Sequence, residues 1–274
     1  MHKTHIEKVL VLVKTGPKQS SKYIETVCTA GIREDGSWIR LYPISFRLYK
    51  EDQRFVKFQW IECSVYKAQN DNRPESFHLD LSSKIILRNI VDTKNNWEKR
   101  RHLLKNCPIY TKKDELIELS KNNLASLAIF HPKSCKFYYR RKSNKEIKDT
   151  GIHKIQLGLN LFDDEILESF KYVEDIPYVF YYQITDYNGV ISNYQIFDWE
   201  IEALYNKYKD SGEQIAIEKV IQKYNSQFLS KDIDLHFFMG TVYLGAILNR
   251  PNPWMIIGVL PLPAKEGYQT LFDF

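Results

Sequence analysis

The amino-acid sequence predicts an α+β fold with mixed, mainly antiparallel sheets, hairpins and several helices. Asp35-Gly36 and Asn188-Gly189 each separate two β-rich stretches, and such dipeptides are the strongest short-range signal for the tight turn of a hairpin. Apolar residues recur near helical spacing in residues 212–229, which indicates an amphipathic helix. With 43% hydrophobic and 27% charged residues, the chain has the composition of a folded globular protein.

The first half of the chain is rich in β-branched and aromatic residues, so we expect mostly strands there. Asp92-Thr93 and Thr111 precede two stretches that favour helix, as N-caps do. The predicted strands cover residues 9–13, 26–32, 38–44, 60–66, 84–87, 126–130 and 135–141, and the predicted helices cover residues 97–105 and 112–121.

The second half combines strands and helices, and a hydrophilic stretch without periodicity, residues 142–154, predicts a linker before it. The sequence therefore predicts a basic β-rich domain at residues 1–145, an acidic α+β domain at 150–263 and a tail at 264–274. The predicted strands here are residues 178–185, 191–197, 237–243 and 254–259, and the predicted helices are residues 163–170, 199–209 and 212–229.

The charge is distributed unevenly along the chain. Residues 1–150 contain 30 lysines and arginines against 17 acidic residues, a net charge of +13, whereas residues 151–274 contain 9 against 17, a net charge of −8. A strongly basic half attracts a polyanion, and DNA or RNA is the default candidate. The alternative is that the two halves neutralise one another across an internal interface.

Basic and aromatic residues alternate in the first half in a way that suits single-stranded or locally opened nucleic acid. Cationic side chains neutralise phosphates, and aromatic rings stack on unpaired bases. The alternative is that the rings belong to the core and the charges form a solvated face. The predicted nucleic-acid contacts are Lys14, Lys18, Lys22, Arg40, Tyr42, Arg47, Arg54, Lys99, Arg100, Arg101, Arg140 and Arg141.

The familiar catalytic motifs are absent from the sequence. It contains no phosphate-binding glycine loop, no Cys-x-x-Cys pair and no zinc-peptidase or zinc-deaminase histidine motif. We therefore predict no metal ligand set, and a catalytic metal would have to be held by scattered carboxylates. Candidates for chelating magnesium are Glu25, Glu62, Asp198 and Glu200.

Two alternatives to nucleic-acid binding alone remain open at this point. The first is a metal-dependent nuclease or nucleic-acid-modifying enzyme, with Glu25, Arg40 and Arg73 as candidate catalytic residues and magnesium as the nuclease cofactor. The second is a sensor of a nucleotide or another phosphorylated ligand, in which the same arginines bind phosphate.

No stretch of the sequence has the length of a membrane-spanning helix. The longest apolar runs, residues 9–13 and 254–262, fall well short of the roughly 18 residues that a span requires. The N-terminus also lacks the apolar core of a signal peptide. We therefore expect no membrane partner and a cytoplasmic location.

The C-terminal tail carries apolar and aromatic residues where a chain is usually least ordered. Gln269, Leu271, Phe272 and Phe274 follow a pattern that resembles the terminal peptides with which DNA-metabolism proteins bind a sliding clamp. The resemblance implies a sliding clamp as a partner; the alternative is that the tail packs on its own domain.

Residues 25–32 and 38–44 resemble an uncharacterised prokaryotic protein family. The resemblance implies a prokaryotic or phage source and a role in mobile-element or defence biology, without naming an activity. Together with the charge distribution, it leads to a nucleic-acid-binding protein of DNA metabolism or defence as the leading interpretation of the sequence.

Overall fold

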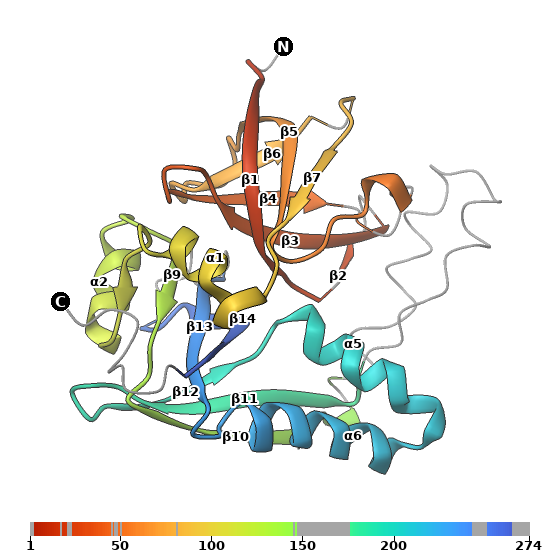
Figure 1. Ribbon diagram of the computed structural model, residues 1–274, viewed down its shortest axis with the longest axis vertical. Coiled ribbons are helices and arrows are strands. Elements are labelled where there is room, and N and C mark those ends of the chain that lie inside the picture. The colour runs from red at the N-terminus through yellow and green to blue at the C-terminus, as the bar shows by residue number, and fades with distance from the viewer. Residues whose placement is uncertain are drawn as a thin grey trace.

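The structure, a computed structural model, has the predicted α+β class. It describes residues 3–16, 18–20, 24–44, 46, 49, 51–80, 82–144, 146, 176–242 and 251–264. Figure 1 shows a group of strands at one end, a sheet flanked by two helices at the other, and a second sheet between them.

The first sheet closes on itself. Its pairings run from β1 to β3, β4, β6, β5 and back to β1, with β2 added to β3 and β7 added to β5. All of these pairs are antiparallel except β4 with β6. A closed circuit leaves the ring without free edges and encloses an apolar interior. The strands are β1 (His5–Lys14), β2 (Lys18–Ser20), β3 (Ile24–Ile32), β4 (Trp38–Ile44), β5 (Gln59–Lys67), β6 (Ser76–Leu79) and β7 (Ile86–Ile90), and a 3₁₀ turn spans Glu51–Gln53.

The described residues form two further sheets. One has the order β14-β13-β9-β8, with β8 parallel to β9. The other is an antiparallel meander, β10-β11-β12. Their strands are β8 (Ile109–Tyr110), β9 (Leu127–Phe130), β10 (Ser134–Arg141), β11 (Tyr178–Thr185), β12 (Ile191–Gln195), β13 (Ile233–Thr241) and β14 (Trp254–Pro263).

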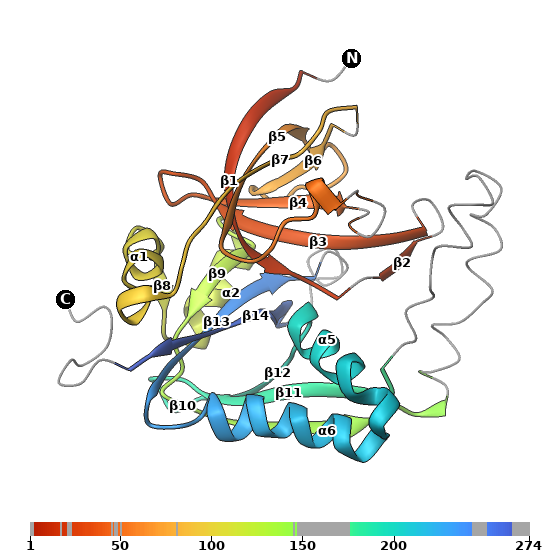
Figure 2. The same ribbon diagram turned by 45° about the vertical axis from the view of Figure 1, so that its right-hand side comes forward.

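The helices lie beside these two sheets, with α5 and α6 along the meander (Figure 2). Asp198 caps α5 by accepting the backbone N–H of Glu200. The first residues of α1, Asn95 to Trp97, adopt left-handed φ angles of 51° to 61° before the regular turns begin. The helices are α1 (Lys94–Leu104), α2 (Lys113–Lys121), α5 (Trp199–Tyr208) and α6 (Glu213–Ile221), followed by a 3₁₀ turn after α5 (Lys209–Ser211) and a π-helical segment after α6 (Gln222–Gln227).

Both predicted hairpins are confirmed, as the β3–β4 and β11–β12 pairs. Gly36 and Gly189 have φ angles of 84° and 82° in their turns, which only glycine adopts without strain. The short strands β2, β6 and β8 were not predicted, because two to four residues carry too little pattern and their pairing is decided by distant strands. The helix predicted at residues 163–170 lies outside the described residues.

The buried apolar residues that the structure describes form three clusters. One fills the closed sheet, and one lies between the meander, α5, α6 and β13. The third joins the closed sheet to the four-stranded sheet, because Leu10 and Ile32 pack with Phe238, Ile257 and Leu260 of β13 and β14.

Candidate nucleic-acid interface

The meander has one apolar face and one polar face. On β10 and β11, Phe137 and Tyr182 point inward and pack against the apolar cluster of α6 and β13. Their neighbours Tyr138 and Tyr181 are cross-strand partners and therefore share the opposite face. We call this opposite side the outward face.

The outward face carries cations, aromatic rings and amides. Among the described residues of the three strands, no outward position holds an aspartate or glutamate, and all but Val179 are exposed or half-buried. The outward residues are Ser134, Lys136, Tyr138 and Arg140 from β10, Val179, Tyr181, Gln183 and Thr185 from β11, and Ile191, Asn193 and Gln195 from β12.

A stacked pair of tyrosines lies in the middle of the outward face. The ring centroids of Tyr138 and Tyr181 are 5.0 Å apart and the rings are within 7° of parallel. Tyr138 is 37% exposed. Beside the pair, the Gln183 amide donates to the Asn193 side-chain oxygen at 3.3 Å. Ring surface and hydrogen-bonding amides therefore lie next to one another on the outward face of the three-stranded meander.

Two arginines lie where β10 ends. Arg140 binds Glu146 through two hydrogen bonds of 2.7 and 3.0 Å, and Arg141 pairs with Glu213 at the start of α6. The hydrogen bonds from Arg140 lower the pKa of Glu146 to about 2. Both arginines are largely exposed, and exposed ion pairs of this kind contribute little to stability because water screens them. A phosphate group can therefore replace either carboxylate at small cost.

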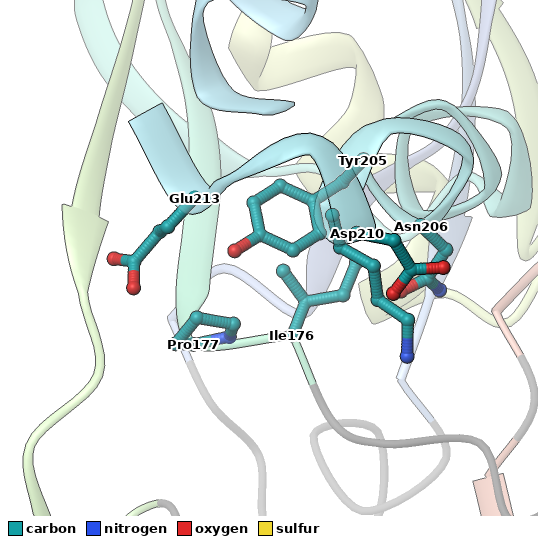
Figure 3. Close-up of a pocket in the computed structure, with 7 residues that line it drawn as sticks. Ile176, Pro177, Tyr205, Asn206, Asp210 and Glu213 are labelled. Atoms are coloured by element: carbon teal, nitrogen blue, oxygen red, sulfur yellow. The ribbon is translucent and has the colours of Figure 1, made fainter. Parts of the chain in front are cut away.

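A pocket opens on the helix side of the same strand ends (Figure 3). Its volume is about 300 Å³, and the Tyr205 ring lies 5.9 Å from that of Tyr178 on β11. Its charged lining consists of Lys209, Asp210 and Glu213, so acidic groups outnumber basic ones. The full lining is Ile176, Pro177, Tyr205, Asn206, Lys209, Asp210 and Glu213.

Arg40 and Arg73, two of the predicted catalytic residues, lie in one buried network. Arg40 is 3% exposed and donates to the backbone and side-chain oxygens of Ser126 at 3.0 and 3.2 Å. The carboxylate of Glu75 accepts the N–H and the hydroxyl of Ser126, each at 2.8 Å. Arg73 pairs with Asp71 and donates to the Thr241 carbonyl. The network joins the closed sheet to Ser126, just before β9, and to Thr241 at the end of β13.

Lys14 lies in a second buried group, where β1 meets the start of α5. Its ammonium lies 4.3 Å from the ring centroid of Phe46 and 5.0 Å from that of Trp199. Burial lowers the pKa of Lys14 to about 8, although the charge of Glu200 acts in the opposite direction. The neighbouring Lys57 has its pKa raised, because the charges of Asp198 and Glu200 outweigh the burial that acts to lower it.

Three of the carboxylates proposed for magnesium, Glu62, Asp198 and Glu200, pair with basic side chains of the protein. Asp198 is fully buried, accepts the Glu200 and Val259 N–H groups, and pairs with Lys57 at 3.4 Å. Glu62 pairs with Arg88 at 2.8 Å. Chelation by Asp198 would require the loss of a helix cap and an ion pair.

The other predicted contacts are scattered over the molecule. Tyr42 is 43% exposed on the closed sheet, and Lys99 pairs with Asp92 at the surface. The guanidinium of Arg100 covers the rings of Phe58 and Trp97. Arg54 donates to the Tyr49 carbonyl, and Arg101 is 5% exposed and donates to the carbonyls of Asn96 and Pro263. Their roles as nucleic-acid contacts stay predictions.

Several predicted residues lie outside the part of the chain that the structure describes. Glu25 and Lys18 lie in strands that the structure describes, but their side chains are outside the described part. The others are Lys22, Arg47, Gln269, Leu271, Phe272 and Phe274.

Sequence reasoning did not single out Lys136, Tyr181 or Gln183. The strict alternation of β10 and β11 is visible in the sequence, and it separates inward from outward residues once the strands are known. The pairing of two strands that are 36 residues apart, however, has no local signal. That pairing is what stacks Tyr181 on Tyr138.

Comparison with known proteins confirms that the chain belongs to an uncharacterised family. Two models match the chain: the domain of unknown function DUF8758 over residues 5–106, and the domain of unknown function DUF8757 over residues 111–274. The matches meet between residues 106 and 111, and the division predicted at 145–150 stays a prediction. No curated protein matches the chain.

None of the described helices has the length and apolarity to cross a membrane. By the match over residues 111–274, which covers more than half of the sequence, the chain belongs to the DUF8757 family.

Proposed function

We propose that this protein binds single-stranded or locally opened nucleic acid on the outward face of the meander. The observation that carries the proposal is the stacked pair of Tyr138 and Tyr181 in the middle of a face whose described strand positions hold cations and no aspartate or glutamate. Base–aromatic stacking contributes about 1–3 kcal/mol per base and tolerates any sequence, because every base has a π-face.

The residues around the tyrosines supply the other two requirements of such a surface. Lys136 is exposed on one side of Tyr138 and Arg140 on the other, so cations flank the stacking site along one strand and can neutralise a phosphate backbone. The amides of Gln183 and Asn193 offer donors and acceptors to base edges. An antiparallel sheet with exposed aromatics is a recurring solution to the binding of unpaired bases.

We place nucleic-acid binding on the outward face of the meander rather than on the closed sheet of the basic half. Arg40 and Arg101 are buried and donate to carbonyls of the protein, which supports their assignment to internal structure. In the same proposal, the protein acts in prokaryotic DNA metabolism or defence. The tail residues Gln269, Leu271 and Phe274 would then tether it to a sliding clamp.

The observed sites do not favour either alternative function. The pocket near Tyr205 has an acidic lining, which repels the phosphate of a nucleotide or another phosphorylated ligand. Asp198 is held by Lys57 and two N–H groups, which leaves it poorly placed to chelate magnesium for a nuclease.

The test is fluorescence anisotropy with labelled single-stranded and duplex DNA and RNA over a salt series. We expect single strands to bind more tightly than duplexes, and Tyr138→Ala and Tyr181→Ala each to weaken binding about tenfold. Lys136→Gln should lower the slope of log affinity against log salt by about one unit.

Two controls locate the surface. Lys121→Gln on α2 removes an exposed charge away from the meander, and Tyr42→Ala removes an exposed ring from the closed sheet; both should leave binding unchanged. Absence of binding at low salt contradicts the function. Binding that is lost with Tyr42 and kept in the Tyr138→Ala/Tyr181→Ala double variant contradicts the site.

A further inference from the structure

Two histidines and an aspartate from β13 and the end of β9 converge at one corner of the four-stranded sheet. Phe237 of β13 pairs with Phe130 of β9, so the next residues on each side, His236 and His131, face one another across the strands. Their rings stack with centroids 4.4 Å apart. Asp234 lies two residues before His236 and so shares its face of the strand.

The three side chains bring their polar atoms together. The Nε2 atom of His131 lies 3.2 Å from Oδ1 of Asp234, and the Nδ1 atom of His236 lies 3.6 Å from the same oxygen. All three potential ligand atoms lie within 4.8 Å of one another. Ligand atoms around a tetrahedral zinc ion, each about 2.0–2.2 Å from the metal, are separated by about 3.3 Å. The spacing of the atoms fits one ion, and because the lone pair of an imidazole nitrogen lies in the plane of its ring, one of the two stacked rings must turn out of the stack for both to bind it.

We propose that His131, Asp234 and His236 bind a divalent transition-metal ion of the zinc class. Imidazole nitrogen favours zinc, copper, iron and nickel, whereas magnesium and calcium prefer oxygen ligands. A site with two nitrogens and one carboxylate is thus distinct from the magnesium centre expected of a nuclease.

The surroundings hold the histidine that lies nearest the surface in a suitable orientation. The hydroxyl of Tyr187 lies 3.3 Å from Nδ1 of His131, which fixes the ring with Nε2 turned toward Asp234. Hydrogen bonds of this kind to the second ring nitrogen orient histidine ligands in metal sites. The nearby Arg101 guanidinium donates to the carbonyls of Asn96 and Pro263, so part of its hydrogen-bonding capacity is directed away from the carboxylate.

The burial of the three groups matches a site with an open position. The side chain of His236 is 1% exposed, whereas those of His131 and Asp234 are 14% and 17% exposed. An ion can therefore enter from the side of His131 and Asp234. Three protein ligands leave a fourth position for water or for an external ligand, as in catalytic zinc sites.

Isothermal titration of the full-length chain with zinc chloride, after dialysis against a chelator, tests the site. We expect one ion per chain with a dissociation constant of about 1 μM or lower, and no displacement by millimolar magnesium. His131→Ala and Asp234→Asn should each weaken binding about 100-fold, and Tyr187→Phe about tenfold. His102→Ala removes an exposed histidine on α1 and should leave affinity unchanged.

Cobalt(II) provides a second measurement on the unaltered chain, independent of how the variants fold. The expected spectrum has the visible bands of four-coordinate cobalt and lacks the near-ultraviolet band of thiolate ligation, because the ligands are nitrogen and oxygen. The proposal is overturned if the wild-type chain binds neither ion. It is also overturned if cobalt shows thiolate ligation, or if folded His131→Ala and Asp234→Asn variants bind zinc as the wild type does.

Discussion

Buried charged side chains are concentrated where the closed sheet meets the rest of the molecule. Arg40 and Glu75 meet at Ser126 in one such group, and in another the buried Asp198 lies beside the partly buried Lys14 and Lys57. A charge removed from water is costly unless polar partners replace the water. At the scale of single residues, stability therefore depends on whether each of these groups keeps its partners.

Lys14 should titrate near pH 8 rather than near 10.5. Between these values the unfolded chain holds a proton that the folded chain has released, so the free energy of unfolding should rise with pH over this window. Nuclear magnetic resonance of ¹³C-methylated lysines measures the midpoint directly. Lys14→Met should remove the titration midpoint near pH 8 and should reduce the rise of the free energy of unfolding with pH. Lys121→Met on the exposed face of α2 should change neither. A midpoint above pH 10 for Lys14 would contradict the lowered pKa.

Glu75→Ala should destabilise the protein by about 2–4 kcal/mol, because the buried N–H and hydroxyl of Ser126 both lose their acceptor. Urea unfolding measures the change. Glu75→Gln keeps one carbonyl oxygen as an acceptor and should cost less than Glu75→Ala. Glu118→Ala on the exposed side of α2 should stay within about 0.5 kcal/mol of wild type. Equal stability of Glu75→Ala and wild type would show that the network contributes nothing.

The closed sheet and the meander are stabilised in different ways at the scale of elements. In the closed sheet every ring strand has two neighbours, so the backbones must approach closely all the way around. The meander instead gains its stability from one apolar face against α6 and β13. Most of the outward positions described on the meander are exposed or half-buried, so substitutions there should cost little stability.

Gly31 is a position where close backbone approach admits no side chain. A Cβ atom there would lie 2.2 Å from the Leu10 carbonyl oxygen and 2.7 Å from the Val9 side chain. Gly31→Ala must therefore separate β1 from β3 and should cost about 3 kcal/mol, measured by denaturant unfolding. A Cβ atom at Gly189 would have no atom within 4 Å, and the only strain would come from the φ angle of 82°. Gly189→Ala should therefore cost about 1 kcal/mol. Equal costs would show that strand spacing adjusts freely.

At the scale of the whole molecule, the two family domains share a core. Leu10 and Ile32 from the first domain and Phe238 and Leu260 from the second belong to one buried cluster. Separation would expose this apolar surface to water, at roughly 25 cal/mol for each Å². The family boundary therefore does not mark two independent folding units.

We expect a single cooperative unfolding transition for the full chain. The fluorescence of its tryptophans, three in residues 5–106 and two in residues 111–274, should follow the same denaturation curve as far-ultraviolet circular dichroism. Two separated transitions, with the first-domain tryptophans changing apart from the rest, would contradict the shared core.

The strand-rich α+β character and both hairpins follow from the sequence alone, because alternation and turn dipeptides such as Asn188-Gly189 act between neighbouring residues. The exposed cations at the end of β10, Arg140 and Arg141, were also visible there. Only the tertiary structure decided that Arg40 is buried, that Tyr181 stacks on Tyr138, and that His131 meets His236. Each of these depends on contacts or strand pairings between segments that lie far apart in the chain. Such pairings are selected by the packing of the whole core, and the local sequence carries no record of which distant strand becomes the neighbour.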